Sequence, residues 1–225
     1  MRRGDPSVGG VERNWFARPT IEVARDLIGC ALIVDGGARD AVVARIVETE
    51  AYLGQQDPAS HAFRGPTRRS AVMFGPPAHL YVYFTYGMHH CANVVTEIDG
   101  VAGAVLLRAA TLEEGLATVR ARRGERVATA ALLSGPGNLC RGLGIGRPDD
   151  GMDLLDPTTR VTIDVRPNVP AIAVSRRVGI RAAADWLLRF SALGDPAVSR
   201  PRPAAASAAA AGDSEIAGDE KKGPD

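Results

Sequence analysis

The sequence predicts an α+β fold: one mixed domain with a curved, mainly antiparallel β-sheet core, a protruding β-hairpin and surrounding helices. Three observations support this prediction. The chain has 225 residues of which 45% are hydrophobic, enough to bury the core of one ordinary domain. Short segments rich in Val, Ile, Leu and Tyr recur along it with Gly and Pro turns between them. No internal repeat or linker interrupts residues 14–200, which we therefore expect to form the single domain.

The elements follow from local patterns. A first helix is expected to begin at Thr20, whose hydroxyl can cap free helix amides, and to end near Gly29. Five strands are expected next, at 30–34, 41–53, 79–86, 89–96 and 103–109. Two further helices are expected at 111–122 and, after the turn at Ser134-Gly135-Pro136, at 136–143.

The two ends of the chain differ from the body in composition. Residues 1–13 are polar and glycine-rich, and residues 201–225 are rich in Ala and Pro, so we predict a mobile N-terminus and a disordered tail. The tail also holds the only lysines, Lys221 and Lys222. The predicted domain therefore contains no lysine nucleophile.

Charge and cysteine content set the broad class. The net charge is +1, and residues 1–200 are slightly more basic because 201–225 hold three basic and five acidic side chains. Cys30, Cys91 and Cys140 form no CxxC pair, which argues against both a disulfide framework and a cysteine-rich zinc site. No apolar run reaches the roughly 20 residues that span a bilayer. We expect a cytoplasmic protein with no membrane partner.

One strand places two acids beside an aromatic side chain. In the segment 45–53, the two-residue period of a strand puts Glu48, Glu50 and Tyr52 on one face. A rigid, partly desolvated carboxylate suits a general base that orients a water molecule. The alternative is a solvated sheet face, which is the commoner meaning of this pattern when it stands alone.

The segment 79–93 predicts a hairpin that turns around Tyr86-Gly87. Its core face would present Leu80, Val82 and Phe84, and its other face Tyr81 and Tyr83, with Tyr86 projecting from the turn. All four tyrosines of the chain lie between positions 52 and 86. Such a cluster suits an enzyme that stacks an extruded base and fills the vacated gap with a wedge. Cross-strand aromatic packing explains it equally well.

Neither a metal nor a nucleotide cofactor is expected. The four histidines, His61, His79, His89 and His90, lack HxxxH or HExxH spacing, and neighbouring strand residues point to opposite faces. The segment 135–140 departs from GxGxxG at Cys140, and no Walker sequence is present. A glycine turn that leads into a helix still offers amides to a DNA phosphate, although an ordinary helix start fits as well.

Together, these segments closely resemble the 3-methyladenine, or alkyladenine, DNA glycosylase family, especially its bacterial branch. The resemblance covers roughly residues 15–200. It depends on RPTIEVARDLIG (18–29), RIVETEAY (45–52), MFGPP (73–77), YVYFTYGMHHCAN (81–93), LLR (106–108) and SGPGNLC (134–140).

The resemblance implies a role for each matched residue. Glu50 would be the general base, with Arg108 close to it and to the backbone of the flipped nucleotide. Tyr52 would form one wall of the base pocket, and His61 and Tyr83 the opposite wall. Asn93 would discriminate against the amine of normal guanine, and Leu106 would also contact the base. Tyr86 would intercalate into the DNA stack. This chain departs from the family at three positions: His89 and His90 stand where the mammalian form has aromatic residues, and Asn138 occupies a loop position where a lysine is common.

The implied activity is that of a monofunctional DNA glycosylase of base excision repair, without a cofactor. It would act as a monomer, associated with the nucleoid, on double-stranded DNA that contains alkylated or deaminated purines. The expected lesions are 3-methyladenine and 7-methylguanine, with hypoxanthine and ethenoadenine left open. For a neutral base the proton donor is also open, between water and groups near His61.

Two other classes of function compete with this one. The first is a DNA- or RNA-binding module that keeps the aromatic surface but performs no hydrolysis. The second is a small-molecule hydrolase that uses Glu48 and Glu50 as a glycosidase pair. The second is disfavoured because such acids usually come from separate strands, whereas these two lie two steps apart on one strand, about 7 Å at the backbone.

Overall fold

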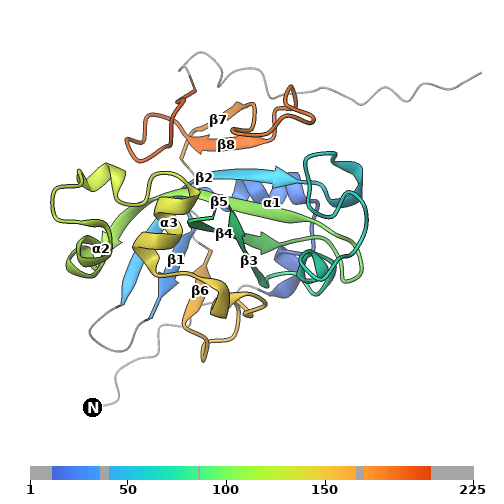
Figure 1. The fold of residues 1–225 in the computed structure, drawn as a ribbon, viewed down its shortest axis with the longest axis horizontal. Helices are drawn as coiled ribbons and strands as arrows, with labels where there is room; N and C mark the ends of the chain where they lie inside the picture. The colour runs from blue at the N-terminus through green and yellow to red at the C-terminus, as the bar shows by residue number, and fades with distance from the viewer. Residues whose placement is uncertain (1–11, 36–40, 86, 166–169, 204–225) are drawn as a thin grey trace, which may run out of the picture.

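The computed structural model describes residues 12–35, 41–85, 87–165 and 170–203. They form one α+β domain in which three helices surround a curled antiparallel sheet, which confirms the predicted fold class (Figure 1). The α-helices are α1 (Thr20–Asp26), α2 (Leu116–Arg123) and α3 (Pro136–Leu143). Five short 3₁₀ helices cover Arg13–Trp15, Gly54–Gln56, Ala71–Phe74, Thr129–Ala131 and Arg147–Asp149. No described helix is both long and apolar enough to cross a membrane.

The sheet branches at its central strand, β2, because one edge of β2 pairs with two different strands along its length. The strands are β1 (Ala31–Val34), β2 (Val42–Tyr52), β3 (Leu80–Thr85), β4 (His89–Val95), β5 (Ala104–Glu114), β6 (Val161–Asp164), β7 (Ile172–Ser175) and β8 (Arg189–Ala192). They pair in the order β3-β4-β5-β2-β1-β6, and β8 joins β2 and β7. On its outer edge, β2 pairs with β1 through residues 42–45 and with β8 through residues 48–50. Figure 1 shows the two branches on opposite sides of β2.

The pairing of β2 with β5 contains three register shifts, and the two closest to the site compensate each other. Ile46 pairs with Ala110 and Glu48 with Ala109, so Val47 is an extra residue on β2. Thr49 then pairs with Leu107, so Arg108 is an extra residue on β5. A bulge bends its strand and redirects a side chain. Here the second bulge directs Arg108 toward the carboxylates of β2.

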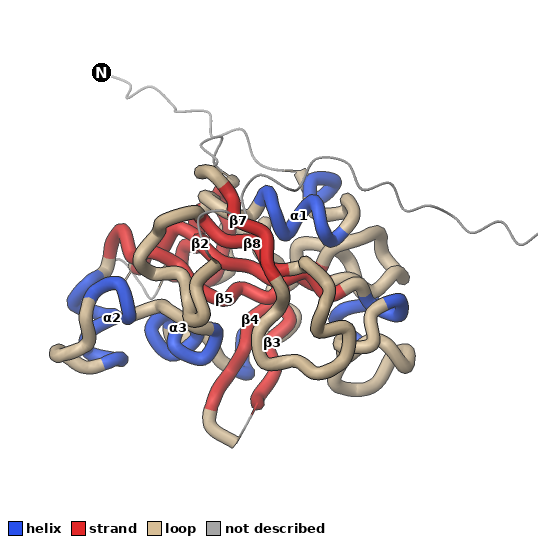
Figure 2. Tube along the Cα trace, turned by 90° about the horizontal axis from the view of Figure 1, so that it is seen from above, coloured by secondary structure: helices blue, strands red, loops and turns tan. Residues whose placement is uncertain are grey.

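The hydrophobic core lies between the sheet and its helices. Helix α1 packs against β2 and β5, and α3 packs against β4, β5 and α2. Fully buried members include Leu27, Ile28, Ile46, Leu107 and Leu139. The β3–β4 hairpin projects away from this body, as predicted (Figure 2). Only the far end of this hairpin leaves the body, because Leu80, Val82, Ala92 and Val94 belong to the core.

Several local predictions are wrong. Residues 111–114 belong to β5 and not to a helix, because β2 extends far enough to pair with them. The strand ends at Gly115, whose φ of 84° lies in the left-handed region that glycine tolerates, and α2 follows. The Thr20 hydroxyl does not cap α1 but donates to Glu97 at 2.7 Å. Phe84 is 51% exposed because its end of the hairpin extends beyond the packed body.

The structure also contains elements that were not predicted, and some predictions fall outside the described residues. The short strands β6, β7 and β8 were not predicted at all. Tyr86, most of the N-terminal segment 1–13 and most of the tail 201–225 lie outside the described residues. The helix at 136–143 and the strands β1 to β4 lie within one or two residues of their predicted bounds.

Candidate active site

Residues of five strands form one row across the sheet. The ladders pair Tyr81 with Asn93, Asn93 with Leu106, Leu106 with Glu50, and Glu50 with Arg189. Directly paired residues on adjacent strands point to the same face. Five strands from distant parts of the sequence therefore present these side chains side by side.

This face forms the floor of an open pocket of about 380 Å³. The pocket is lined by six of the predicted site residues: Tyr52, His61, Tyr83, Asn93, Leu106 and Arg108. Glu50 has no exposed surface and lies just below the floor, where it contacts the lining residues Tyr52, Arg108 and Val178. Such a volume is typical of sites for small ligands or single groups of larger ones.

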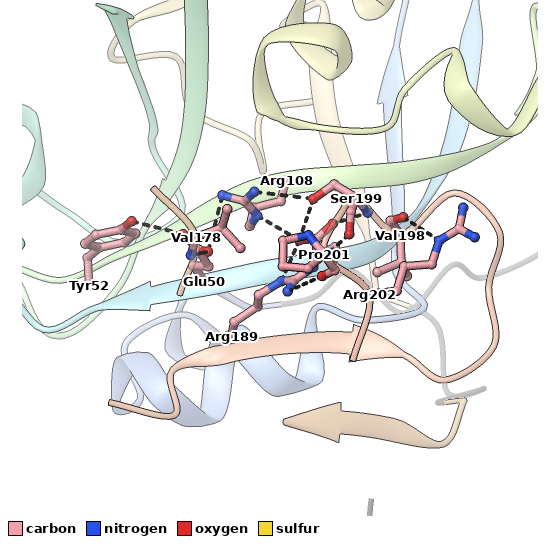
Figure 3. A network of polar contacts seen from close by, with 10 residues as sticks. Glu50, Tyr52, Arg108, Val178, Arg189, Val198, Ser199, Pro201 and Arg202 are labelled. Carbon is pink, nitrogen blue, oxygen red and sulfur yellow. Dashed lines mark hydrogen bonds and ion pairs between the residues drawn. The ribbon is translucent and has the colours of Figure 1, made fainter. Parts of the chain in front are cut away.

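Three donors surround the Glu50 carboxylate (Figure 3). The Tyr52 hydroxyl donates to Oε2 at 3.0 Å, and the Val178 amide donates to Oε1 at 2.7 Å. The Nη1 atom of Arg108 lies 3.2 Å from Oε1. Burial raises the pKa of Glu50, and Arg108 and the two hydrogen bonds offset this only in part. The predicted alternative of a solvated sheet face is therefore wrong.

Glu48 has a different environment on the same face. Its Oε1 accepts from the Nε atoms of Arg108 and Arg189, each at 2.7 Å, and from the Ser199 hydroxyl at 2.9 Å. The Ser199 amide donates to Oε2 at 2.7 Å. Burial alone would raise the pKa of Glu48, but Arg108, Arg189 and Ser199 together lower it. Glu48 is thus held as a carboxylate and does not line the pocket.

A buried ion pair holds the loop that supplies the Val178 amide. Arg177 donates to both oxygens of Asp57 and, at 2.9 Å, to the carbonyl of Ala51. Its guanidinium also lies over the Tyr52 ring, 4.6 Å from the centroid. Arg177 therefore holds in place the Tyr52 side chain and the Val178 amide, which are the two donors to Glu50 other than Arg108.

One wall of the pocket is aromatic. The rings of His61 and Tyr83 meet edge to face at 4.5 Å, and the His61 Nδ1 atom lies 3.0 Å from the Tyr81 hydroxyl. Partial desolvation against these rings, with the nearby charge of Arg69, lowers the pKa of His61 to about 4. Although His61 lies at the exposed rim, its imidazole is therefore neutral at neutral pH.

The remaining predicted residues have identifiable contacts. The Asn93 amide nitrogen donates to the Tyr81 carbonyl at 3.0 Å, which fixes its orientation in the pocket floor. Asn138 donates to the Ser134 carbonyl at 2.7 Å and so stabilises the turn before α3. His89 packs so closely on Gly137 that a Cβ atom there would lie 2.9 Å from its ring. His90 lies against Phe84, with ring centroids 5.1 Å apart.

Comparison with known proteins decides the family. The family profile of methylpurine-DNA glycosylase (MPG) matches residues 14–196. The chain belongs to this family. A protein of Corynebacterium jeikeium named as a 3-methyladenine DNA glycosylase is 46% identical over 201 residues, which cover 85% of this chain and 92% of its own length. Proteins of the same name from Chlorobaculum tepidum (43%; 84% and 90% covered) and Anaeromyxobacter dehalogenans (48%; 86% and 87%) are also similar.

Membership of the methylpurine-DNA glycosylase family makes this chain a DNA repair enzyme, a hydrolase that acts on N-glycosyl bonds. The predicted alternative of a binding module without catalysis is thereby excluded. The predicted pair of glycosidase acids also finds no support in the geometry, since Glu48 is fully occupied by Arg108, Arg189 and Ser199.

Sequence reasoning did not find five residues around the glycosylase carboxylates: Asp57, Arg177, Val178, Arg189 and Ser199. One of them left a signal. Arg189 interrupts an otherwise apolar run at 187–190, and a charged residue in a buried strand must have a partner. Asp57 lies in a polar loop and gave no such indication.

Proposed function

We propose that this glycosylase releases alkylated purines from double-stranded DNA with Glu50 as the general base. A water molecule on the pocket floor would be activated by Glu50 and attack the anomeric carbon of the flipped nucleotide. The observation that carries this proposal is the position of Glu50, buried directly below the pocket and contacted by three of its lining residues. A carboxylate with raised proton affinity in such a place suits general base catalysis.

The proposed lesions are 3-methyladenine and 7-methylguanine. Alkylation at N3 or N7 makes the purine cationic, so it is a good leaving group that needs little help from a protein acid. Cations bind favourably to aromatic rings, and the rings of Tyr52 and Tyr83 both line the pocket. Asn93 would disfavour the exocyclic amine of normal guanine. A panel of duplexes, each with one defined lesion, will decide whether hypoxanthine and ethenoadenine are also released.

Base flipping is the second part of the proposal. Stacking of the base on an aromatic wall is worth roughly 1–3 kcal/mol, which offsets much of an unstacking cost of a few kcal/mol. The hairpin that carries Tyr83 projects from the body, where it can meet the duplex. We propose that Tyr86, which follows β3 in the sequence and lies outside the described residues, fills the vacated stack.

The substitution Glu50→Gln tests the role of the base. We expect release of 3-methyladenine from methylated duplex DNA to fall by roughly 10²–10⁴-fold, because glutamine does not accept the proton of water. Binding of the damaged duplex should persist, since the shape of the pocket is kept. Glu114→Gln, an exposed acid on β5, is the matched control and should release the base at the wild-type rate. Undiminished release by Glu50→Gln would contradict the proposal.

A further inference from the structure

We propose that Arg189 is a positioning residue of this glycosylase: by pairing with Glu48, it leaves one amino group of Arg108 available to hold Glu50. The inference rests on the proposed role of Glu50 as the base. Arg189 does not line the pocket and would touch neither the base nor the water. Its effect would pass through Glu48 and Arg108.

The contacts of Arg108 show why a second arginine is needed. Its Nε atom lies 2.7 Å from Glu48, its Nη1 atom 3.2 Å from Glu50, and its Nη2 atom donates to the Ser199 hydroxyl at 3.3 Å. The shortest of these contacts goes to Glu48 and not to the proposed base. Without another partner, Glu48 would compete more strongly for the Arg108 guanidinium.

Arg189 provides that partner from the other edge of β2. It pairs directly with Glu50 in the β2–β8 ladder, yet its Nε atom donates to Glu48 at 2.7 Å. Its two amino groups donate to the carbonyls of Pro201 and Ser199, at 2.8 and 2.9 Å. All three nitrogens of this buried guanidinium are therefore occupied, and Figure 3 shows Arg189 beside Ser199 and Pro201. The geometry holds Arg189 on Glu48 and away from Glu50.

The cluster is balanced in charge. Two carboxylates, Glu48 and Glu50, face two guanidiniums, Arg108 and Arg189, and all four side chains are buried. The other titratable groups near Glu50 are Tyr52, Cys91 and the Arg177–Asp57 pair, which neutralises itself. Loss of one guanidinium would leave an excess negative charge, and Glu50, which has fewer charged partners than Glu48, would take up a proton more readily.

The pH dependence of catalysis tests this inference. The rate of methylpurine release from methylated duplex DNA is measured under single-turnover conditions over roughly pH 4 to 9, a range that begins near the usual carboxyl pKa of about 4.3 and extends upward, the direction in which burial shifts the pKa of Glu50. The leaving bases are already cationic, so the acidic limb reports the general base. We expect Arg189→Met to move this limb up by about one pH unit. Glu48→Gln should move it down, because two guanidiniums would then face Glu50 alone.

The double variant and two matched controls separate charge from structure. Glu48→Gln combined with Arg189→Met removes one charge of each sign, so its limb should return close to the wild-type position. Arg189→Lys keeps the charge and should also keep the limb. Arg202→Met removes another arginine, which follows Pro201 in the sequence. The Arg202 side chain donates to the carbonyls of Val198 and Pro196, so its loss should leave the pH profile unchanged.

The possible outcomes decide between the two claims. A slower Arg189→Met enzyme with the wild-type limb would overturn the inference and leave Arg189 a structural residue. If Arg189→Met does not fold, as judged by circular dichroism, Glu48→Gln decides: an unshifted limb overturns the inference and a downward shift supports it. Activity retained by Glu50→Gln would instead overturn the proposed function. If Glu50→Gln is inactive but the acidic limbs of the Arg189→Met and Glu48→Gln profiles do not shift, the inference is overturned and the proposed function stands.

Discussion

Glu48 and Glu50 are separated by one residue on the same strand face, yet their proton affinities shift in opposite directions. Glu48 has two guanidiniums at 2.7 Å, which overcome the cost of burial. Glu50 has one at 3.2 Å, which does not. The sequence predicted that the two acids and Tyr52 share a face. It did not predict that two arginines would pair with Glu48 and only one with Glu50. That difference depends on Arg189, which lies 141 positions from Glu48.

His61 gives a prediction at the same scale. Its folded pKa of about 4 lies below the unfolded value, so folding favours the neutral imidazole. The contribution of His61 to stability is therefore complete above about pH 6.5 and is lost as the pH falls toward 4. We expect an NMR titration of the imidazole signals to show one histidine that protonates near pH 4. His61→Gln assigns the signal, and a His61 titration near the unfolded value would contradict the prediction.

At the scale of elements, the site depends on segments that wrap around β2. The loop that holds Arg177 and Val178 covers one end of the Glu50 carboxylate, and residues 199–201 cover Glu48. Each is tied down by a buried arginine, Arg177 on Asp57 and Arg189 on Glu48. The strand thus supplies the acids, while later segments of the chain determine their environment.

Removal of Asp57 should loosen the first of these segments. Asp57→Ala leaves the Arg177 charge buried and unpaired, so we expect the free energy of unfolding in urea to fall by about 3–5 kcal/mol. The rate of base release should also fall, because the Val178 amide follows Arg177. Asp185→Ala, an exposed acid nearby, should change stability by less than about 0.5 kcal/mol. A loss from Asp57→Ala no larger than that of this control would show that the ion pair does not hold the loop.

The elements that the sequence predicted are those with clear local patterns. The strands near 30–34, 41–53, 79–86 and 89–96 and the helix at 136–143 combine strong periodicity with turn residues. The helix at 111–122 was placed too early because residues 111–114 suit a helix locally but pair with β2 in the folded chain. The strands β6 to β8 have four residues each, too few for a periodic pattern.

At the scale of the whole molecule, arginine supplies all the side-chain cations of the predicted domain. The only lysines are Lys221 and Lys222, so residues 1–220 contain no side-chain amine. Arginine suits this cluster because its planar guanidinium can bind two carboxylates at once, as Arg108 does with Glu48 and Glu50. A guanidinium does not form a Schiff base with deoxyribose.

This composition predicts that the enzyme is monofunctional. We expect no covalent protein–DNA product when the enzyme acts on methylated duplex DNA in the presence of sodium borohydride, because strand cleavage by a lyase requires an amine. A glycosylase that uses a catalytic lysine provides the positive control. A trapped product would contradict the prediction, and peptide mapping would then identify the amine, whether terminal or in the tail.

The paired bulges at Val47 and Arg108 determine how this site tolerates changes in chain length. Beyond the bulges, β2 and β5 return to regular pairing, so Glu50 lies opposite Leu106 and Tyr52 opposite Ala104. Deletion of Val47 would remove the extra residue of β2 and leave the bulge at Arg108 without its counterpart. Deletion of a regularly paired residue such as Ala51 would instead force the strand either to lose its pairing or to slip by one residue, and a slip sends every side chain to the opposite face. The face that carries Glu50 and Tyr52 is thus more sensitive to a single deletion among the regularly paired residues than to most substitutions, and we expect variation in length to be confined to the loops.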